Sequence, residues 1–584
     1  MHIPINFIDH LKEFVNIEQD TQNLEQEGIY RKPIEARVAD ALAINDLTVE
    51  RFEINRAVLS FPVNRSKFRE GDALRLHRED PTRNFIKCEL VEETENNQLV
   101  LKPGFQQNFV RLEPSTGWVL DMDLTDIREI QLSALEEINQ NEDLNAYYHR
   151  LFNGRVHQEF RKSLSEQDSI VPQALRGNSR QVEAFQNAYL ASNFYLIQGP
   201  PGTGKTRVLA YLAEYFASQN MNVLITAFTH RAINNALKSI AKYTNPSILM
   251  KIGQSINAND LDWEGRKVTN YERFSDSGKN PKQKGMIIGG TCFALRSRRL
   301  QDLAFDVVIF DEAGQMPLPL ALIGMGRAPK TIFIGDHKQM PPVITGEHAE
   351  RWVQKSIFEV LFEHYPGTML DVTYRMNDRI ADFPSRQFYG GNLHSDKNNA
   401  DKRIRLSPVI GTWNQVLSPE HPDVFVQIDH QFRTIDSIEE AEIAAELAVE
   451  AINAGLMPHE LAIVAPYRAQ GRLIKSELRK RIKPINLARQ IVVDTVERIQ
   501  GQEREMIIIS LTTSDSSHAA KNAEFYFQPN RLNVAITRPK SKRIIIGSKY
   551  LFAAEPKSVE HCEWVRLFRE LYEQCEIIQV KNKN

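Results

Sequence analysis

The sequence predicts an α/β fold with two parallel-sheet units in tandem, preceded by a small β-barrel. A glycine-rich turn over 199–206 separates a short apolar run from an amphipathic run, which is a strand–turn–helix pattern. From about residue 172, β-branched apolar runs alternate with amphipathic runs, and such continuous strands are typical of a parallel sheet buried on both faces. Short strands with polar turns over 51–120 are typical of a small barrel.

Composition, charge and cysteine content exclude several classes of protein. The 584 residues are 42% hydrophobic and 25% charged, as in multidomain globular proteins, and the net charge of −3 confines any nucleic-acid binding to a local groove. Four cysteines without a C-x-x-C pair argue against a disulfide scaffold, a zinc finger or an iron–sulfur cluster. The start lacks signal-peptide features and no run of about 18 apolar residues occurs, so we expect a soluble cytoplasmic protein without membrane partners.

Three segments precede the parallel-sheet units. Residues 1–50 are expected to form an N-terminal helical segment, because apolar residues such as Phe7 and Leu11 recur at helical spacing. The barrel over 51–120 has two open interpretations, a nucleic-acid-gripping module and a plain structural module. Residues 121–171 are predicted to form a helical stalk leading away from the barrel.

The two parallel-sheet units are expected over 172–365 and 366–584. Residues 245–285 are polar and contain the breaker pair Asn280-Pro281, so they are predicted to be an insertion in the first unit. Ligand-bearing loops should lie at the carboxyl ends of the strands, as in other open parallel sheets.

The glycine-rich turn has the chemistry of a phosphate-binding P-loop, which indicates ATP as cofactor. Its backbone N–H groups and the positive end of the next helix would surround the phosphates. Lys205 is expected to reach the β- and γ-phosphates, and the Thr206 hydroxyl to bind Mg²⁺. The turn comprises Gly199, Pro200, Pro201, Gly202, Thr203, Gly204, Lys205 and Thr206.

Polar residues that follow other strands complete a candidate hydrolytic site. Asp311 and Glu312 come directly after an apolar strand, where one carboxylate can bind Mg²⁺ and the next can polarise the attacking water. Gln339, after the next strand, can orient water or sense the γ-phosphate. Arg375 and Arg538 in the second unit can stabilise charge on the transferred phosphoryl group, although either arginine alone is more often part of a salt bridge.

These residues stand in an ordered series of motifs that resembles the superfamily 1B helicases over about residues 172–550. That group includes the up-frameshift RNA helicases and the replication helicase–nucleases. The sequence around Thr229-His230 resembles the replication helicase–nucleases more closely. The motifs are Asn178 to Gln181, Gly199 to Thr206, Thr226 to Ala232, Thr291-Cys292, Asp311 to Gln315, Gly335 to Pro342, Tyr374 to Asn377, Pro466 to Gln470, Asp494 to Glu503 and Arg531 to Arg538.

The resemblance implies two tandem RecA-like P-loop domains, a barrel on a helical stalk, and 5′-to-3′ polarity. It implies that Gln181 reads the adenine, and that Glu503 acts with Gln339, Arg375 and Arg538 to couple the nucleotide to closure of the cleft. The residues implied to contact the nucleic-acid strand are Thr229, His230, Thr291, Tyr467, Gln470 and Thr495.

The chain departs from the family pattern in several places. Thr373 and Gln502 stand where the family usually has Gln and a basic residue. No Cys/His-rich regulatory domain and no cysteine-clamped nuclease domain is recognisable, so neither nonsense-mediated decay nor DNA-end cleavage is expected. The basic stretches 296–299 and 475–481 can line a strand channel or form solvated helix faces.

The resulting hypothesis is an ATP-dependent 5′-to-3′ helicase or translocase on single-stranded nucleic acid, with DNA favoured over RNA although no motif encodes that choice. One alternative is a strand-stimulated ATPase that acts as a clamp or ribonucleoprotein remodeller in a defence or repair assembly. A second is a nucleotide-sensing module without turnover, which the intact Glu312, Gln339, Arg375 and Arg538 argue against.

Overall fold

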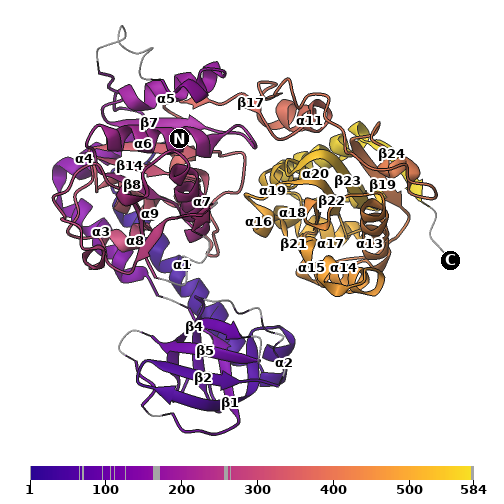
Figure 1. Cartoon of the computed structure of the whole chain (residues 1–584), viewed down its shortest axis with the longest axis horizontal. Coiled ribbons are helices and arrows are strands. Elements are labelled where there is room, and N and C mark those ends of the chain that lie inside the picture. Colours follow the sequence, from indigo (N-terminus) through magenta and orange to yellow (C-terminus); the bar gives the residue numbers. More distant parts are fainter. Residues whose placement is uncertain are drawn as a thin grey trace.

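The computed structural model consists of a small barrel and two larger α/β lobes (Figure 1). It describes residues 2–580 except 63, 65, 67, 69–70, 95–96, 105–106, 111, 125, 162–170, 255–260 and 264. Parts of the predicted stalk (162–170) and of the predicted insertion (255–260) therefore lie outside the described residues. Every helix in the described ranges is too short or too polar to cross a bilayer. All four cysteines are free thiols.

The barrel is closed, with strand order β1-β2-β5-β4-β3-β6 and antiparallel neighbours throughout. Its interior is filled by apolar side chains such as Leu47, Leu59 and Leu120. The strands are β1 (Ala43–Glu53), β2 (Arg56–Ser60), β3 (Ala73–His77), β4 (Ile86–Thr94), β5 (Gln98–Pro103) and β6 (Trp118–Met122).

The first barrel strand begins inside the segment predicted to be helical. Ala43 and Ile44 are buried in the barrel, so the expected limit of 50 for the helical segment is wrong. The register between β1 and β6 shifts between Ile44 and Leu47, which interrupts the alternation that marks a strand. That irregularity explains why the pattern became recognisable only after residue 50.

The stalk is a pair of antiparallel helices, α1 (Phe7–Tyr30) and α3 (Arg128–Gln140). Lys12 pairs with Glu136 near one end, and Arg128 lies 2.9 Å from Asp20 near the other. The hydroxyl of Tyr30 donates to a carbonyl at the end of β6, which joins α1 to the barrel. The remaining helices of this region are α2 (Ile34–Ala39) and α4 (Glu142–Phe152).

Lobe 1 contains an eight-stranded parallel sheet in the order β12-β9-β13-β8-β14-β15-β7-β16. Val308 and Ile309, neighbours in β14, belong to apolar clusters on opposite faces, which confirms a sheet buried on both sides. The strands are β7 (Phe194–Gln198), β8 (Val223–Thr226), β9 (Leu249–Ile252), β12 (Thr269–Tyr271), β13 (Ile287–Gly289), β14 (Val307–Phe310), β15 (Lys330–Gly335) and β16 (Thr368–Met369), beside the hairpin of β10 (Asp262–Trp263) and β11 (Arg266–Lys267). The helices are α5 (Ser179–Leu190), α6 (Lys205–Ser218), α7 (His230–Ala241), α8 (Cys292–Leu295), α9 (Leu318–Met325) and α10 (Ile357–Phe362).

The segment 245–285 is not simply an insertion. Two of its strands, β9 and β12, extend the main sheet, and β9 lies between β12 and β13. The polar breakers that suggested an excursion follow β12, while β9 itself is a short apolar run around the fully buried Lys251. A four-residue strand gives a weak periodic signal beside a long polar stretch.

Lobe 2 contains a six-stranded parallel sheet in the order β21-β20-β22-β23-β19-β24, so the predicted α/β fold class is confirmed. The strands are β19 (Asp423–Ile428), β20 (Leu461–Val464), β21 (Val492–Asp494), β22 (Arg504–Ser510), β23 (Pro539–Gly547) and β24 (Glu576–Val580), with β17 (Val372–Thr373) and β18 (His394–Ser395) paired nearby. The helices are α11 (Asp378–Phe388), α12 (Asn414–Leu417), α13 (Ile438–Asn453), α14 (Arg468–Arg481), α15 (Ile485–Gln490), α16 (Val496–Ile499), α17 (Ser516–Lys521), α18 (Ala523–Tyr526), α19 (Pro529–Ile536) and α20 (Val559–Gln574). Figure 1 shows α16 and α19 on the side of lobe 2 that faces lobe 1.

Candidate nucleotide site between the lobes

The glycine-rich turn joins β7 to α6 and curves around an open concavity. Gly202 and Gly204 have φ values of 76° and 85°, a left-handed conformation that a side chain would strain. A Cβ atom at Gly202 would also lie 2.6 Å from the Cβ of Arg375, so the turn packs closely against a segment of the second unit. The Nζ of Lys205 donates to the carbonyl of Gly199 at 2.5 Å, which places the ammonium group within the turn.

Gln181 lies beside this turn, and one of its two side-chain polar atoms is hydrogen-bonded to it. Its Nε2 donates to the carbonyl of Thr203 at 2.9 Å, and the side chain is buried. Its Oε1 has no hydrogen-bond partner among the described residues. A buried acceptor without a partner costs free energy, so a donor such as the exocyclic amine of adenine fits this position.

Asp311 and Glu312 follow β14 directly. Burial and the neighbouring Glu312 carboxylate raise the pKa of Asp311 to about 7, although the charge of Lys205 opposes this shift. Glu312 has a φ of 51°, an uncommon conformation for a residue with a side chain. This backbone conformation at Glu312 accompanies the close approach of its carboxylate to that of Asp311. A bound cation would favour the ionised form of both carboxylates.

The loop after β15 brings Gln339 to the boundary of the lobes. The Nε2 of Gln339 donates to Asp336 Oδ2 at 2.7 Å, and its Oε1 accepts from Nη2 of Arg538 at 3.2 Å. Arg538 is 2% exposed, and burial together with the nearby Arg375 lowers its pKa to about 9. This hydrogen bond links a side chain of lobe 1 to a cation of lobe 2.

Arg375 approaches the same region through the segment between β17 and α11. The N–H of Tyr374 donates to the carbonyl of Gly202 at 2.8 Å, which places Arg375 beside the glycine-rich turn. Nε of Arg375 donates to Glu503 Oε2 at 2.7 Å, and Nη1 donates to the carbonyl of Thr537 at 3.0 Å. The guanidinium is therefore fixed by lobe 2, while the backbone of the preceding Tyr374 is hydrogen-bonded to lobe 1.

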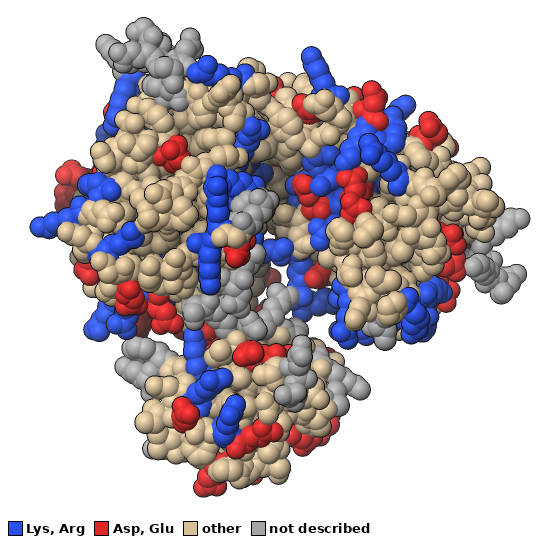
Figure 2. Space-filling model, viewed as in Figure 1, with Lys and Arg blue, Asp and Glu red and all other residues tan. Residues whose placement is uncertain are grey.

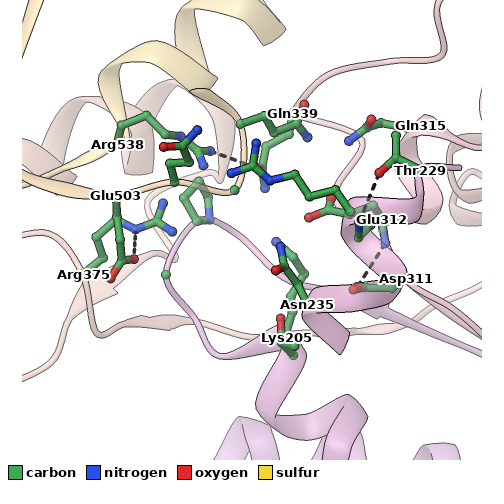
Figure 3. A pocket seen from close by; sticks show the side chains of 18 of the residues that line it. Lys205, Thr229, Asn235, Asp311, Glu312, Gln315, Gln339, Arg375, Glu503 and Arg538 are labelled. Atoms are coloured by element: carbon green, nitrogen blue, oxygen red, sulfur yellow. Dashed lines mark hydrogen bonds and ion pairs between the residues drawn. The ribbon is translucent and has the colours of Figure 1, made fainter. Parts of the chain in front are cut away.

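These groups line one cavity of about 620 Å³ between the lobes. In Figure 3, Lys205, Asp311 and Glu312 lie on one side of the cavity, and Arg375, Glu503 and Arg538 lie on the other. The lining residues are Pro200, Pro201, Gly202, Thr203, Gly204, Lys205, Thr206, Thr229, Arg231, Ala232, Asn235, Asp311, Glu312, Gln315, Gln339, Arg375, Asp494, Glu497, Arg498, Gln500, Gly501, Gln502, Glu503 and Arg538. The structure thus brings the predicted acids, the P-loop lysine and both predicted arginines together.

The donor atoms fit a magnesium–nucleotide complex better than a metal held by protein alone. Within the described ranges, no three His, Cys, Asp or Glu side chains are grouped to bind a metal. Thr206 and Asp311 both line the cavity and offer hard oxygen ligands. Mg²⁺ commonly uses one or two protein ligands together with phosphate oxygens, which is the arrangement this cavity allows.

Most residues expected to contact the nucleic-acid strand lie at the carboxyl ends of β-strands. Thr229, Thr291 and Thr495 occupy the positions just before α7, α8 and α16, and Tyr467 is the residue before α14. Thr229, which is expected to contact the nucleic-acid strand, also lines the nucleotide cavity.

His230 is largely enclosed beside these positions. Its Nδ1 has no hydrogen-bond partner among the described residues. Burial, with the charges of Lys251 and Arg299, lowers the pKa of His230 to about 4, so the ring is neutral at pH 7. It can therefore donate or accept a hydrogen bond there without carrying charge.

Gln470 does not lie where the resemblance suggested. It is fully buried, and its Oε1 accepts from the N–H of Ser437 at 2.8 Å. Its Nε2 donates to the carbonyl of Ser437 at 3.0 Å and to the Ser510 hydroxyl at 3.1 Å. With its amide satisfied inside lobe 2, Gln470 supports the interior instead of reaching a strand.

The two basic stretches have different positions. Arg296 of the first stretch forms a hydrogen-bonded ion pair with Glu137 of α3 at 2.5 Å, so it fastens lobe 1 to the stalk. The second stretch forms the last turn of α14, where Lys480 and Arg481 pair with Glu477. Figure 2 shows Lys and Arg side chains gathered along the lower edge of lobe 2, over α14 and α15.

Some polar residues of the cavity were not singled out from the sequence. Asn235 of α7 and Glu497 of α16 line it because their helices begin at its edge. Gln315 follows Asp311-Glu312 within the same motif, and that proximity was the available signal. Glu497 lies likewise within the motif from Asp494 to Glu503, whereas Asn235 follows the motif that ends at Ala232 and carries no comparable local pattern.

Comparisons with known proteins agree with this architecture. Two families, each described as an AAA domain, match residues 176–380 and 353–550. The Schizosaccharomyces pombe protein named DNA replication ATP-dependent helicase/nuclease dna2 is 28% identical over 396 residues, which cover 64% of this chain and 28% of that protein. The Mus musculus protein of the corresponding name is 28% identical over 415 residues, covering 65% of this chain and 38% of that protein.

The chain thus spans between about a quarter and two fifths of the length of these curated relatives. Among solved structures, the Arterivirus nonstructural protein 10 helicase has 12% sequence identity and a TM-score of 0.36. That similarity covers 86% of this chain and 78% of the viral chain.

Proposed function

Because this chain belongs to the superfamily 1B helicases, we propose that it uses ATP to move 5′ to 3′ along single-stranded nucleic acid, with DNA favoured over RNA. The family is one of ATP-dependent helicases, which is the enzyme class that the sequence predicted. The names of the curated relatives, which refer to DNA replication, support the choice of DNA.

The cavity between the lobes is the observation that carries this proposal. Its acids and P-loop belong to lobe 1, while Arg375 and Arg538 reach it from lobe 2. A site divided between two bodies can change their relative position when its ligand changes charge. Such a division supports a motor more than a nucleotide-sensing module of one lobe.

The residues take distinct parts in the proposed reaction. ATP supplies a phosphoryl group for transfer to water, and Mg²⁺ beside Thr206 and Asp311 would offset its negative charge. Glu312 is placed to accept a proton from the attacking water. Arg375 and Arg538 stabilise the charge that develops on the phosphoryl oxygens, a contribution of about 10³-fold or more in related P-loop enzymes.

Strand movement follows from alternating closure of the two lobes. Thr229, His230 and Thr291 of lobe 1 and Tyr467 and Thr495 of lobe 2 are the proposed strand contacts. These residues lie just after the carboxyl ends of β-strands, which is where ligands bind in open parallel sheets. When the lobes close around ATP, each lobe would bind the nucleic-acid strand at a different position. Opening after hydrolysis would move the contact of one lobe along the strand.

The proposal is tested by ATP turnover and by separation of tailed duplexes. We expect single-stranded DNA to stimulate the ATPase, and Lys205→Ala to lower that rate by at least a hundredfold because the phosphates lose their main cation. Lys557→Ala is the matched control, since Lys557 is exposed and lies outside the cavity lining. The wild-type chain should open a duplex with a 5′ single-stranded tail.

The remaining outcomes separate the alternatives. Efficient opening only from 3′ tails would contradict the polarity. Strand-stimulated turnover without any duplex opening would favour the clamp or remodeller, and absence of turnover would favour the nucleotide-sensing module. Matched DNA and RNA oligonucleotides test the polymer preference, and stronger stimulation by RNA would contradict it.

A further inference from the structure

We propose that Tyr389 is a positioning residue for ATP hydrolysis, because its hydroxyl joins Asp336 of lobe 1 to Asn533 of lobe 2. The inference rests on the proposed function and adds a residue outside the cavity lining. Its part is to keep Gln339 and Arg538 aligned across the boundary of the lobes.

The hydroxyl of Tyr389 occupies a buried position between two elements. It donates to Asp336 Oδ2 at 2.7 Å and accepts from Nδ2 of Asn533 at 2.8 Å. Tyr389 is 4% exposed, and burial together with Asp336 raises its pKa well above its ordinary value, so the hydroxyl keeps its proton. Asp336 follows β15 and Asn533 belongs to α19, so one oxygen atom bridges the two lobes.

The Asp336 carboxylate is enclosed by four neutral donors. Besides the hydroxyl of Tyr389, these are Nε2 of Gln339 at 2.7 Å, the N–H of Lys338 at 3.1 Å and Nε2 of Gln198 at 3.3 Å. Asp336 is 2% exposed, so water is not freely available to replace a lost donor. Because Tyr389 and Gln339 share the same oxygen, removal of the hydroxyl changes the group that anchors Gln339.

The anchor determines which end of the Gln339 amide faces Arg538. With Nε2 held by Asp336, Oε1 points to Nη2 of Arg538 at 3.2 Å. A reversed amide would place its NH₂ group against a guanidinium, which is a donor only. The carboxylate thus selects the amide orientation in which the two lobes attract each other.

The other end of the connection fixes α19 against the loop after β15. Nδ2 of Asn533 donates to the carbonyl of Lys338 at 2.8 Å, and Nδ2 of Asn530 donates to the carbonyl of His337 at 2.9 Å. Arg538 lies just beyond this helix, and its Nε donates to the carbonyl of Val534 at 2.9 Å. A closed circuit therefore runs from Tyr389 through Asp336, Gln339, Arg538 and α19 back to Tyr389.

Tyr389→Phe tests the proposal, because it keeps the ring and removes only the hydroxyl. Tyr365→Phe is the matched control: the Tyr365 hydroxyl is also buried, donates to the carbonyl of Leu151 at 2.8 Å and accepts from the N–H of Val156 at 3.2 Å, away from the cavity. We expect Tyr389→Phe to lower the kcat of the strand-stimulated ATPase about tenfold while the KM for ATP stays within twofold. The melting temperatures of the two variants should be similar.

A second comparison shows whether Tyr389 acts through Gln339. In a Gln339→Ala background, the added Tyr389→Phe change should cause no further loss of kcat, since the side chain to be positioned is gone. Equal kcat values for Tyr389→Phe and Tyr365→Phe would overturn the inference, and so would a full tenfold loss in the Gln339→Ala background. A wild-type chain without strand-stimulated ATPase would overturn the proposed function as well, which separates the two failures.

Discussion

Glu503 is the acid that fixes Arg375 at the edge of the nucleotide cavity. Its Oε2 accepts from Nε of Arg375 at 2.7 Å, and its Oε1 lies 3.1 Å from Nζ of Lys540. Burial would raise the pKa of Glu503, but the two cations outweigh it and lower the pKa from 4.5 to about 2. The carboxylate is therefore ionised at every pH at which the enzyme would work.

This lowered pKa predicts a pH-dependent contribution to stability. Glu503 is harder to protonate in the folded chain than in the unfolded chain, so its contribution is full above pH 5 and falls as the pH drops from about 4.5 towards 2. The difference in melting temperature between wild type and Glu503→Gln should be constant from pH 8 to 5.5 and smaller at pH 4. Thermal melts across this range measure it.

An exposed acid supplies the control for that measurement. Glu560, in the first turn of α20, is exposed, so the Glu560→Gln difference should stay small throughout. A Glu503→Gln difference that is the same at pH 4 as at pH 7 would contradict the assignment of the ion pair.

Single residues also show where sequence reasoning reaches its limit. The P-loop was recognisable in the sequence because its chemistry depends on residues adjacent in the chain, and both Lys205 and Thr206 line the cavity. For Gln470, the resemblance of its motif to the helicase family implies a contact with the nucleic-acid strand. The hydrogen-bond partners of the buried Gln470 side chain include Ser437 and Ser510, which are remote in sequence. A local sequence pattern therefore could not predict its burial.

Among the elements, the turns after β14 and β15 interlock through two glycines. A Cβ atom at Gly314 would lie 2.7 Å from the carbonyl oxygen of Asp336, and one at Gly335 would lie 2.7 Å from the nitrogen of Gly314. Neither glycine has a positive φ, so close backbone approach is the reason that these positions exclude a side chain. The contact brings Glu312 and Gln339 to the same cavity.

Gly314→Ala should therefore displace the loop that carries Gln339. We expect a loss of about 1–3 kcal/mol of stability from the forced separation, and a kcat of the strand-stimulated ATPase at least tenfold lower. Denaturant melts and steady-state turnover measure the two effects. Gly28→Ala is the control, because a Cβ there meets nothing within 4 Å and alanine favours the helix. Wild-type turnover in Gly314→Ala would contradict the proposed interlocking of the turns.

The elements that the sequence concealed are irregular or interrupted by a charged residue. β1 contains a register shift, and the four-residue apolar run of β9 is interrupted by Lys251. β14 also has four residues, but its run is entirely apolar, and it was recognisable because burial on both faces favours continuous apolar sequence. Regularity and an uninterrupted apolar run therefore separate the strands that could be predicted from those that could not.

Across the whole molecule, the stalk is fastened to lobe 1 at Glu18 of α1. The carboxylate accepts from the N–H groups of Thr345 at 2.9 Å and Gly346 at 2.8 Å, and from Nε2 of His348 at 2.6 Å. These residues follow the loop that carries Gln339. Because α1 contacts the barrel at its far end, the stalk connects the barrel to the loop beyond the nucleotide site.

Glu18→Ala should loosen this connection. Two backbone N–H groups, the Thr345 hydroxyl and an imidazole lose a charged acceptor, so we expect a loss of about 2 kcal/mol, seen as a melting temperature lower by about 5 °C. Glu25→Ala on an exposed position of the same helix is the control and should melt within about 1 °C of wild type. Melting of Glu18→Ala at the wild-type temperature would show that the contacts of Glu18 contribute little to the attachment of the stalk.

The amino-acid sequence was sufficient to predict the chemical groups that line the cavity and the two parallel-sheet units, because P-loop chemistry and continuous apolar strands depend on neighbouring residues. Only the folded chain could decide that Gln470 is interior, that 245–285 extends the main sheet, and that Tyr389 lies between the lobes. These outcomes depend on contacts between residues far apart in the chain, such as Tyr389 with Asp336 and Asn533. Such contacts form when whole elements pack together, and no periodicity or motif specifies them beforehand.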